Sequence, residues 1–300
     1  MDEGHPDKET FQATLEDHIK RIRGTSRQRV TEETARRQRF EKRTGVLYQQ
    51  QFALFDTIFL ELQSVGYAVI KEQLPDANKD QDYLYAVLYR LWGRAVLASS
   101  EIRALLVSGH ATGASARWRT IYEILVVTSF ITKHGATIAE RYYHHDRILA
   151  LKVAEAVQKY ATDPIAPTTE PAALLHLRGL RDTLAAKYGP EFITDYGWAS
   201  PAIISPKKGQ PNPNPTFRDI EKAVAEEGSL KLLKPWYTYT SQVIHASSFG
   251  NTHSTQNPFQ DQRVVTGPSQ AGFGDPAWLT LRVLLSITMY FAQVRTKGLT

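Results

Sequence analysis

The chain has 300 residues, of which 42% are apolar and 22% are charged, a composition typical of a globular protein with one large domain or two small ones. The absence of cysteine excludes disulfides, thiolate nucleophiles and cysteine-ligated zinc, and it agrees with a reducing compartment. The formal net charge is +5, and it is unevenly placed along the chain.

Two segments bear on membrane targeting. The first twelve residues are polar and acidic, and they lack the apolar run of a secretory signal. The stretch 277–294 is apolar, but Arg282 and Gln293 interrupt it, which favours a core helix over a membrane span. These features predict a cytoplasmic protein that does not enter a membrane.

Residues 10–45 have the composition of a polar, basic helix. Between residues 20 and 43, ten lysines and arginines stand against three glutamates, so this segment nets +7 and the rest of the chain nets −2. We therefore separate a basic helical arm, residues 1–45, from a single domain, residues 46–300. The arm is expected either to contact nucleic-acid phosphates or to be a solvated helix with i,i+4 Glu/Arg pairs. The candidate nucleic-acid-binding residues are Arg21, Arg23, Arg27, Arg29, Arg36, Arg37 and Arg39.

Helical periodicity dominates the next hundred residues. Apolar residues from Tyr48 onward predict a helix, with an interruption at Gly66 and a turn at Pro75. A second helix is expected over 80–108 and a third over 113–134, each followed by a glycine that suits a helix end.

A fourth helix is predicted to run to about Tyr160, with Thr137 as its N-cap and Glu140 completing a capping box. Prolines then predict an irregular insertion around residues 161–215, which encloses one helix at 172–188.

The last third of the chain predicts helices and one long loop. Residues 216–248 are expected to be helical, with breaks near Gly228 and Pro235, and residues 249–275 to form a long loop before a final apolar helix. A short strand at 263–265 is the only β-type pattern. The expected fold is all-α, a multi-helix bundle with a proline-rich insertion and an N-terminal basic helical arm.

The third predicted helix carries the first candidate site. After Glu123 this helix is apolar on almost all sides through Ile131, which predicts burial and makes an unpaired carboxylate costly. Arg119 precedes Glu123 by four residues on the same face, and Arg117 lies one turn back on another face. These residues form either a structural Arg–Glu pair or a functional carboxylate with cationic neighbours.

Histidines supply further candidates. His145 aligns with the apolar face of its helix and is expected to point inward, as a general acid or base or as a satisfied core histidine. His245 ends a later helix, where the macrodipole favours it, and it is also a candidate to approach Glu123 from the other side of the bundle. Glu140 and His144 have the spacing of two metal ligands on one helix turn, but no complete set is apparent, so we assign no metal or cofactor.

One run of residues points to a family. The segment from Ala104 to Glu123, which includes Arg117-Trp118-Arg119-Thr120-Ile121-Tyr122-Glu123, resembles the bacterial domain of unknown function 5677 family. Glu140-Arg141-Tyr142 with His145, and Val243-Ile244-His245-Ala246-Ser247, resemble it as well.

This resemblance spans roughly residues 50–295 and carries implications about function. Such proteins are similar to helical abortive-infection and HEPN-type domains, which implies a role in bacterial antiviral defence. Some of those domains cleave RNA with an Arg-x(4–6)-His pair. That spacing occurs here only in Arg103…His110, and Ala104 stands where a polar residue usually follows the arginine.

Three functional hypotheses remain open. The working hypothesis is a non-enzymatic helical module of bacterial defence or stress type that binds a nucleotide, a nucleic acid or a protein partner. The first alternative is a metal-independent ribonuclease or toxin-like effector, in which Arg117 and Arg119 bind phosphate, His145 is the acid or base and Glu123 orients one of them. The second alternative is a metal-dependent hydrolase that uses Glu140 and His144. Candidate partners are RNA or a nucleotide, and a second copy of the chain.

Overall fold

The computed structural model describes residues 8–160, 170–205, 209–245, 247–250 and 267–294. Within these residues the regular structure is helical, and one isolated antiparallel bridge joins Ile204 to Pro211 where no strand forms. The all-α multi-helix bundle expected from the sequence is confirmed.

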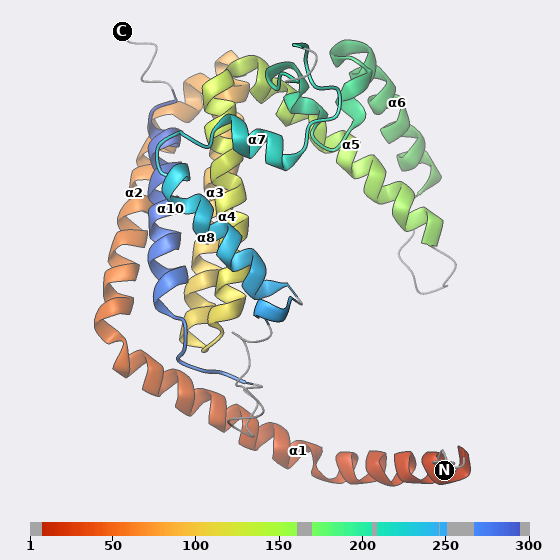
Figure 1. Cartoon of the computed structure of the whole chain (residues 1–300), viewed down its shortest axis with the longest axis vertical. Coiled ribbons are helices and arrows are strands. Elements are labelled where there is room, and N and C mark those ends of the chain that lie inside the picture. Colours follow the sequence, from red (N-terminus) through yellow and green to blue (C-terminus); the bar gives the residue numbers. More distant parts are fainter. Residues whose placement is uncertain (1–7, 161–169, 206–208, 246, 251–266, 295–300) are drawn as a thin grey trace.

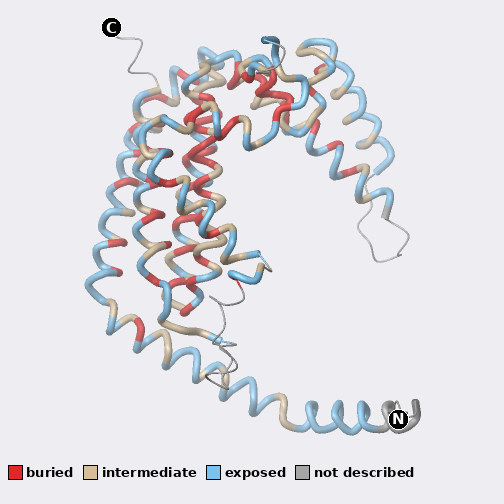
Figure 2. Tube along the Cα trace, in the orientation of Figure 1, coloured by how far each residue is buried: buried red, intermediate tan, exposed pale blue. Residues whose placement is uncertain are grey.

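Three helices form the centre of the bundle and two more cover it (Figure 1). The central helices are α3 (Tyr83–Val107), α4 (Ala111–His134) and α10 (Gly274–Ala292), which pack against one another. Helix α2 (Gln49–Asp80) packs against α3 and α10, and α8 (Leu230–Ile244) packs against α4. Buried positions run along α3 and α4 (Figure 2), as expected for helices that are covered on most sides.

The apolar stretch examined for a membrane span, 277–294, largely coincides with α10 in the centre of the bundle. Among the described helices, α2 has the length and apolar composition of a membrane span, with 22% of its most apolar window buried. Its outer side carries exposed Leu54, Leu60 and Tyr67.

Helix α2 corrects two expectations, because it passes through both Gly66 and Pro75 without a break. Gly66 serves packing, since a Cβ at this position would overlap the indole ring of the buried Trp92 on α3. Pro75 lies near the end of the helix, which continues to Asp80 and stops at Gln81 in the left-handed conformation. Pro235 likewise lies inside α8 and does not interrupt it.

The sharp turn between α3 and α4 also anchors the N-terminal arm. Gly109 adopts φ +81°, and a Cβ there would lie 2.5 Å from Cε1 of Phe40 on α1 (Lys8–Leu47). The Ser108 hydroxyl donates to the Glu41 carboxylate at 2.9 Å. The C-terminal end of α1 is therefore fixed to the bundle, while the remainder extends away from it and is largely exposed (Figures 1 and 2). The predicted basic helix is confirmed.

The proline-rich insertion is more ordered than expected. Its described part contains α6 (Pro171–Tyr188), which confirms the predicted helix, and two 3₁₀-helices, η1 (Pro190–Ile193) and η2 (Gly197–Ala202). These elements pack against α5 (Ala136–Tyr160). The buried Arg141 of α5 explains the order, because its guanidinium donates to three main-chain carbonyls, those of Tyr188, Gly197 and Trp198, at 2.9–3.1 Å.

The predicted start of α5 was wrong in detail. The helix begins at Ala136, so Thr137 lies inside it and is not the N-cap. Glu140 forms no capping box, because its carboxylate accepts hydrogen bonds from Lys187 and Tyr188 of α6 at 2.7 and 2.8 Å.

The later elements follow the prediction except for the break expected near Pro235. Helix α7 (Phe217–Ala223) begins with a capping box between Thr216 and Asp219, and Gly228 at φ +46° separates it from α8 as expected. The strand expected at 263–265, most of the 249–275 loop and residues 161–169 lie outside the described residues.

The close contact between α2 and α3 predicts different effects for two helical glycines. Gly66→Ala is expected to lower the free energy of unfolding by roughly 1–3 kcal/mol, because the new methyl group overpacks the Trp92 ring. Gly93→Ala on α3 is the matched control: nothing lies within 4 Å of its Cβ position, so it should raise stability by up to about 1 kcal/mol through helix propensity. Urea denaturation of both variants measures the difference, and equal stabilities would contradict the packing role of Gly66.

Candidate functional site

Four polar side chains meet where α8 crosses α4, and we call them the Arg119 cluster: Arg119, Glu123, Tyr237 and His245. Arg119 and Glu123 share one face of α4, four residues apart. Tyr237 lies in the middle of α8, and His245 is the residue that ends it. The sequence therefore anticipated three of the four members, from two helices more than a hundred residues apart.

A phenol joins the cation to the carboxylate. Arg119 Nη2 donates to the Tyr237 hydroxyl at 3.0 Å, and that hydroxyl donates to Glu123 Oε1, also at 3.0 Å. The direct distance from Arg119 Nη2 to Glu123 Oε1 is 3.9 Å. The Arg119 guanidinium also lies over the Tyr237 ring, 4.8 Å from its centroid. The expected Arg–Glu pair is thus a three-residue network with Tyr237 at its centre.

His245 stands at the solvent side of this network. Its Nε2 lies 3.5 Å from Arg119 Nη1. Because a guanidinium only donates hydrogen bonds, this arrangement suits a neutral imidazole whose Nε2 is the acceptor. A phenol, a carboxylate and an imidazole thus gather around one guanidinium.

Tyr122 supports the cluster through its contact with Tyr237. The Tyr237 ring stacks on Tyr122 of α4 with centroids 4.5 Å apart, and the Tyr122 hydroxyl donates to Glu221 Oε1 at 2.9 Å. Lys234 lies 3.3 Å from the other Glu221 oxygen. Burial raises the pKa of Tyr122 well above its usual range, and burial also raises the pKa of Tyr237. Both phenols therefore stay protonated at neutral pH and act as donors.

The expected burial of Glu123 was wrong. Its side chain is 43% exposed, and the Arg119 side chain is 20% exposed. The fully covered part of α4 includes Trp118 and Ile121 but leaves open the stripe on which Arg119 and Glu123 lie. One polar atom of the cluster is sequestered: Arg119 Nε is buried without a hydrogen-bond partner in the described structure.

Arg117 and His145 do not join the cluster. Arg117 forms an ion pair with Glu101 of α3, on another face of α4. His145 points inward as predicted, but its Nε2 lies 2.8 Å from the Thr194 carbonyl and its ring contacts Phe192. Burial lowers the pKa of His145. The ribonuclease arrangement of Arg117, Arg119, Glu123 and His145 is thus divided between separate places in the fold.

Glu140 and His144, which have the spacing of two metal ligands, contact different partners in the structure. Glu140 is engaged by α6, and the His144 ring contacts Tyr83 and Tyr188 edge-on or tilted. Among the described residues, no group of three histidine, aspartate or glutamate side chains is placed to hold a metal ion. The arginine of the Arg-x(6)-His spacing is also engaged, because Arg103 makes two 2.8 Å hydrogen bonds to Asp56.

Most cationic side chains of α1 remain exposed. Arg36 and Arg37 pair with Glu33, as the solvated-helix interpretation expected for part of the arm, and Arg21 lies 3.2 Å from the His18 ring. For the remaining four candidates no salt bridge is found within the described residues; these are Arg23, Arg27, Arg29 and Arg39.

Tyr237 was not among the candidates because the apolar pattern of α8 predicts a core stripe that is one position off. Leu232, Trp236, Tyr239 and Val243 recur at helical spacing in the sequence and are expected to face inward. In the structure Leu232 is 60% exposed, whereas Leu230, Leu233 and Thr240 are buried. Tyr237 continues the spacing of these buried residues, because Leu230, Leu233 and Tyr237 stand at i, i+3 and i+7. This spacing is the sequence signal that would have predicted that Tyr237 faces α4.

The buried His145 predicts a pH-dependent stability. Because its folded pKa is lowered, the unfolded chain binds a proton that the folded chain does not, so stability is complete above about pH 6.5 and falls as the pH drops below it. His145→Gln should flatten this loss between pH 7.5 and 5.5. The loss should not vanish, because burial also lowers the pKa of His134 and His144. The check is urea denaturation across this range, with exposed His110→Gln as the control; identical slopes in both variants would contradict the assignment.

Comparison with known proteins gives a family without an assigned activity. No curated protein and no solved structure matches the chain significantly. A model of a family of unknown function, DUF5677, matches residues 85–262, which is a narrower span than the resemblance suggested but more than half of the chain. The match contains all four members of the Arg119 cluster, and it leaves out α1 and α10. The chain belongs to the family of unknown function DUF5677.

Proposed function

We propose that the protein is a non-enzymatic helical module of bacterial defence or stress type that binds nucleic acid through α1. The observation that carries this proposal is the charge of the arm: the +7 segment from residue 20 to residue 43 lies entirely within one exposed helix. The rest of the chain is slightly acidic, so the positive potential is local and directed away from the bundle.

The geometry of α1 suits a phosphate backbone. At about 1.5 Å per residue, the 24-residue basic segment extends over roughly 36 Å, which allows several phosphates to be contacted at once. Its C-terminal end is fixed to the bundle through Glu41 and Phe40, so the cations are presented on a rigid element with one anchored end. Exposed guanidinium groups that lack acidic partners lose no salt bridge on binding phosphate.

The Arg119 cluster has a structural role in this proposal. Arg119 and Glu123 satisfy each other through the Tyr237 hydroxyl and thereby fix the rotation of α8 against α4. The two helices are distant in sequence, so this network specifies how they meet. No group of the cluster has to react for the module to bind.

Neutralising the arm is expected to weaken nucleic-acid binding. In the triple variant Arg21→Gln, Arg23→Gln and Arg27→Gln, affinity for RNA should fall, and the slope of log K against log salt should become shallower by about 0.7–0.9 per lost phosphate contact. The matched control removes three exposed charges elsewhere that also form no salt bridge within the described residues, Lys71, Lys222 and Arg282, by the same substitution to glutamine.

Fluorescence anisotropy with a labelled single-stranded RNA and with a duplex, at 50 to 200 mM salt, measures both quantities. Equal slopes for the arm variant and the control variant would refute α1 as the binding element. Both variants must retain the far-UV circular dichroism of the wild type, and exposed surface positions make that outcome expected.

A second candidate function, the metal-independent ribonuclease, is favoured by one observation: the 3.5 Å approach of His245 to Arg119. A neutral His245 imidazole would take the proton of an RNA 2′-hydroxyl, whose oxygen attacks the adjacent phosphorus. The bond from phosphorus to the 5′-oxygen breaks, the 5′-oxygen takes a proton from solvent water, and a 2′,3′-cyclic phosphate forms. The His245 imidazolium then returns its proton to the hydroxide that is left. Arg119 would stabilise the negative charge of the phosphorane.

Substitutions of two arginines on α4 distinguish the ribonuclease hypothesis from the binding-module hypothesis. If the cluster cleaves RNA, cleavage of total RNA by the purified protein should resist EDTA and fall at least about 100-fold in Arg119→Ala and in His245→Ala. Arg117→Ala is the matched control, because Arg117 pairs with Glu101 and lies outside the cluster. Gel analysis of the RNA gives the result. Absence of cleavage by the wild type, or equal loss in Arg117→Ala, would count against the ribonuclease.

A further inference from the structure

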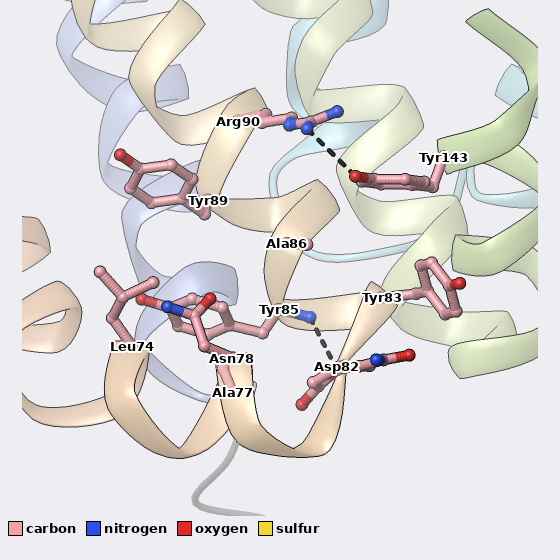
Figure 3. A pocket seen from close by; sticks show the side chains of 11 residues that line it. Leu74, Ala77, Asn78, Asp82, Tyr83, Tyr85, Ala86, Tyr89, Arg90 and Tyr143 are labelled. Atoms are coloured by element: carbon pink, nitrogen blue, oxygen red, sulfur yellow. Dashed lines mark hydrogen bonds between the residues drawn. The ribbon is translucent and has the colours of Figure 1, made fainter. Parts of the chain in front are cut away.

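A pocket of about 440 Å³ opens between the C-terminal end of α2, the first turns of α3 and Tyr143 in the first half of α5 (Figure 3). It is separate from α1 and from the Arg119 cluster, and none of the candidate residues predicted from the sequence lines it. Its volume lies within the range of small-molecule sites in proteins, roughly 300–1,000 Å³.

Tyrosines form two opposite walls of the pocket. On one side Tyr85 and Tyr89 stack with centroids 6.3 Å apart, and both contact Phe291 of α10. On the other side Tyr83 packs edge-on against Tyr143, with centroids 5.2 Å apart. These pairs are held by neighbouring rings, so the walls are formed before any ligand enters.

Ala86 lies between the two walls. Figure 3 shows Tyr89 and Tyr143 on opposite sides of the segment of α3 that carries Ala86. The single methyl group leaves open the space that a larger side chain would fill. We call this space between Tyr89 and Tyr143, with Ala86 at its base, the slot. A flat ring lying over Ala86 would have aromatic side chains on both sides and would gain dispersion contacts with them.

Arg90 places a cation at one end of the slot. Its guanidinium lies 4.6 Å from the Tyr143 ring centroid, and Nη2 donates to the Tyr143 hydroxyl at 3.4 Å (Figure 3). No salt bridge to Arg90 is found within the described residues. Stacking on Tyr143 orients the guanidinium and leaves most of its N–H donors for a ligand. Arg147 lies 5.6 Å from the same ring and adds to the positive potential.

The other end of the slot carries one neutral polar side chain and one acidic side chain. Asn78 and Asp82 line it, where α2 ends and α3 begins. The Asp82 carboxylate caps α3 by accepting from the Tyr85 N–H at 3.0 Å, which fixes its position. Amide and carboxylate groups at this end offer both donors and acceptors to the edge of a heteroaromatic ring.

We propose that this pocket binds a nucleoside monophosphate or a closely similar heteroaromatic anion. The ring lies over Ala86 between Tyr89 and Tyr143, its polar edge meets Asn78 and Asp82, and the anionic group meets Arg90. The proposal does not depend on nucleic-acid binding by α1, because no residue of α1 lines the pocket.

The first test distinguishes the contribution of the aromatic ring to affinity from that of the anionic group. Isothermal titration of the full chain with AMP, adenosine and ribose 5-phosphate should show AMP binding, adenosine binding at least about 10-fold more weakly, and no detectable ribose 5-phosphate binding. Failure of AMP to bind at millimolar concentration would overturn the proposal. Ribose 5-phosphate binding as strong as that of AMP would overturn the role of the ring slot.

The second test uses two arginines one turn apart on α3. Arg90→Gln should weaken AMP at least 10-fold and leave adenosine unchanged, whereas Arg94→Gln, which removes an exposed charge outside the pocket, should affect neither. Ala86→Leu fills the slot and should abolish AMP binding, with circular dichroism as the check on folding. Equal effects of Arg90→Gln and Arg94→Gln would reduce the site to a diffuse positive charge and refute the proposal.

Discussion

Helix α4 must be covered along most of its surface, and the arrangement of the bundle follows from that requirement. Trp118, Ile121, Tyr122 and Phe130 are fully buried, and α3, α5, α7, α8 and α10 all pack against this helix. Burial of such large side chains is the main favourable contribution to folding. The stripe that remains open carries Arg119 and Glu123, so the polar cluster forms where α8 closes over the edge of this covered helix.

Buried polar groups elsewhere organise the insertion. The Arg141 guanidinium satisfies three main-chain carbonyls at once, and His145 one turn later meets the Thr194 carbonyl. Carbonyls in irregular segments need donors when they are buried, and α5 supplies them from a rigid helix. His145, which the sequence offered as a candidate acid or base, therefore helps to hold the end of η1 in place. Glu140, with metal-ligand spacing, is likewise engaged by α6.

Charge and aromatic surface are segregated in the molecule. The cations of α1 are exposed and anchored at one end, the Arg119 cluster lies at the crossing of α4 and α8, and the tyrosine pocket lies at the turn between α2 and α3. The three features share no residues. The family match includes the cluster and the part of the pocket formed by Tyr85, Ala86, Tyr89, Arg90 and Tyr143, but it leaves out the arm. The proposed nucleic-acid element therefore lies outside the part of the chain that defines the family.

The sequence by itself determined the all-α class, most helix ends and the basic arm, because periodicity, glycine and local charge act over a few residues. It also offered Arg119, Glu123 and His245 as candidates, with an approach of His245 to Glu123 as one of two alternatives. The tertiary structure decided the rest. In the sequence Gly66 indicates a helix break, whereas in the structure α2 continues through it and Trp92 packs against it. Tyr237 lies at the centre of the cluster because of the rotation of α8. Partners more than a hundred residues apart depend on helix crossing and rotation, which local patterns do not specify.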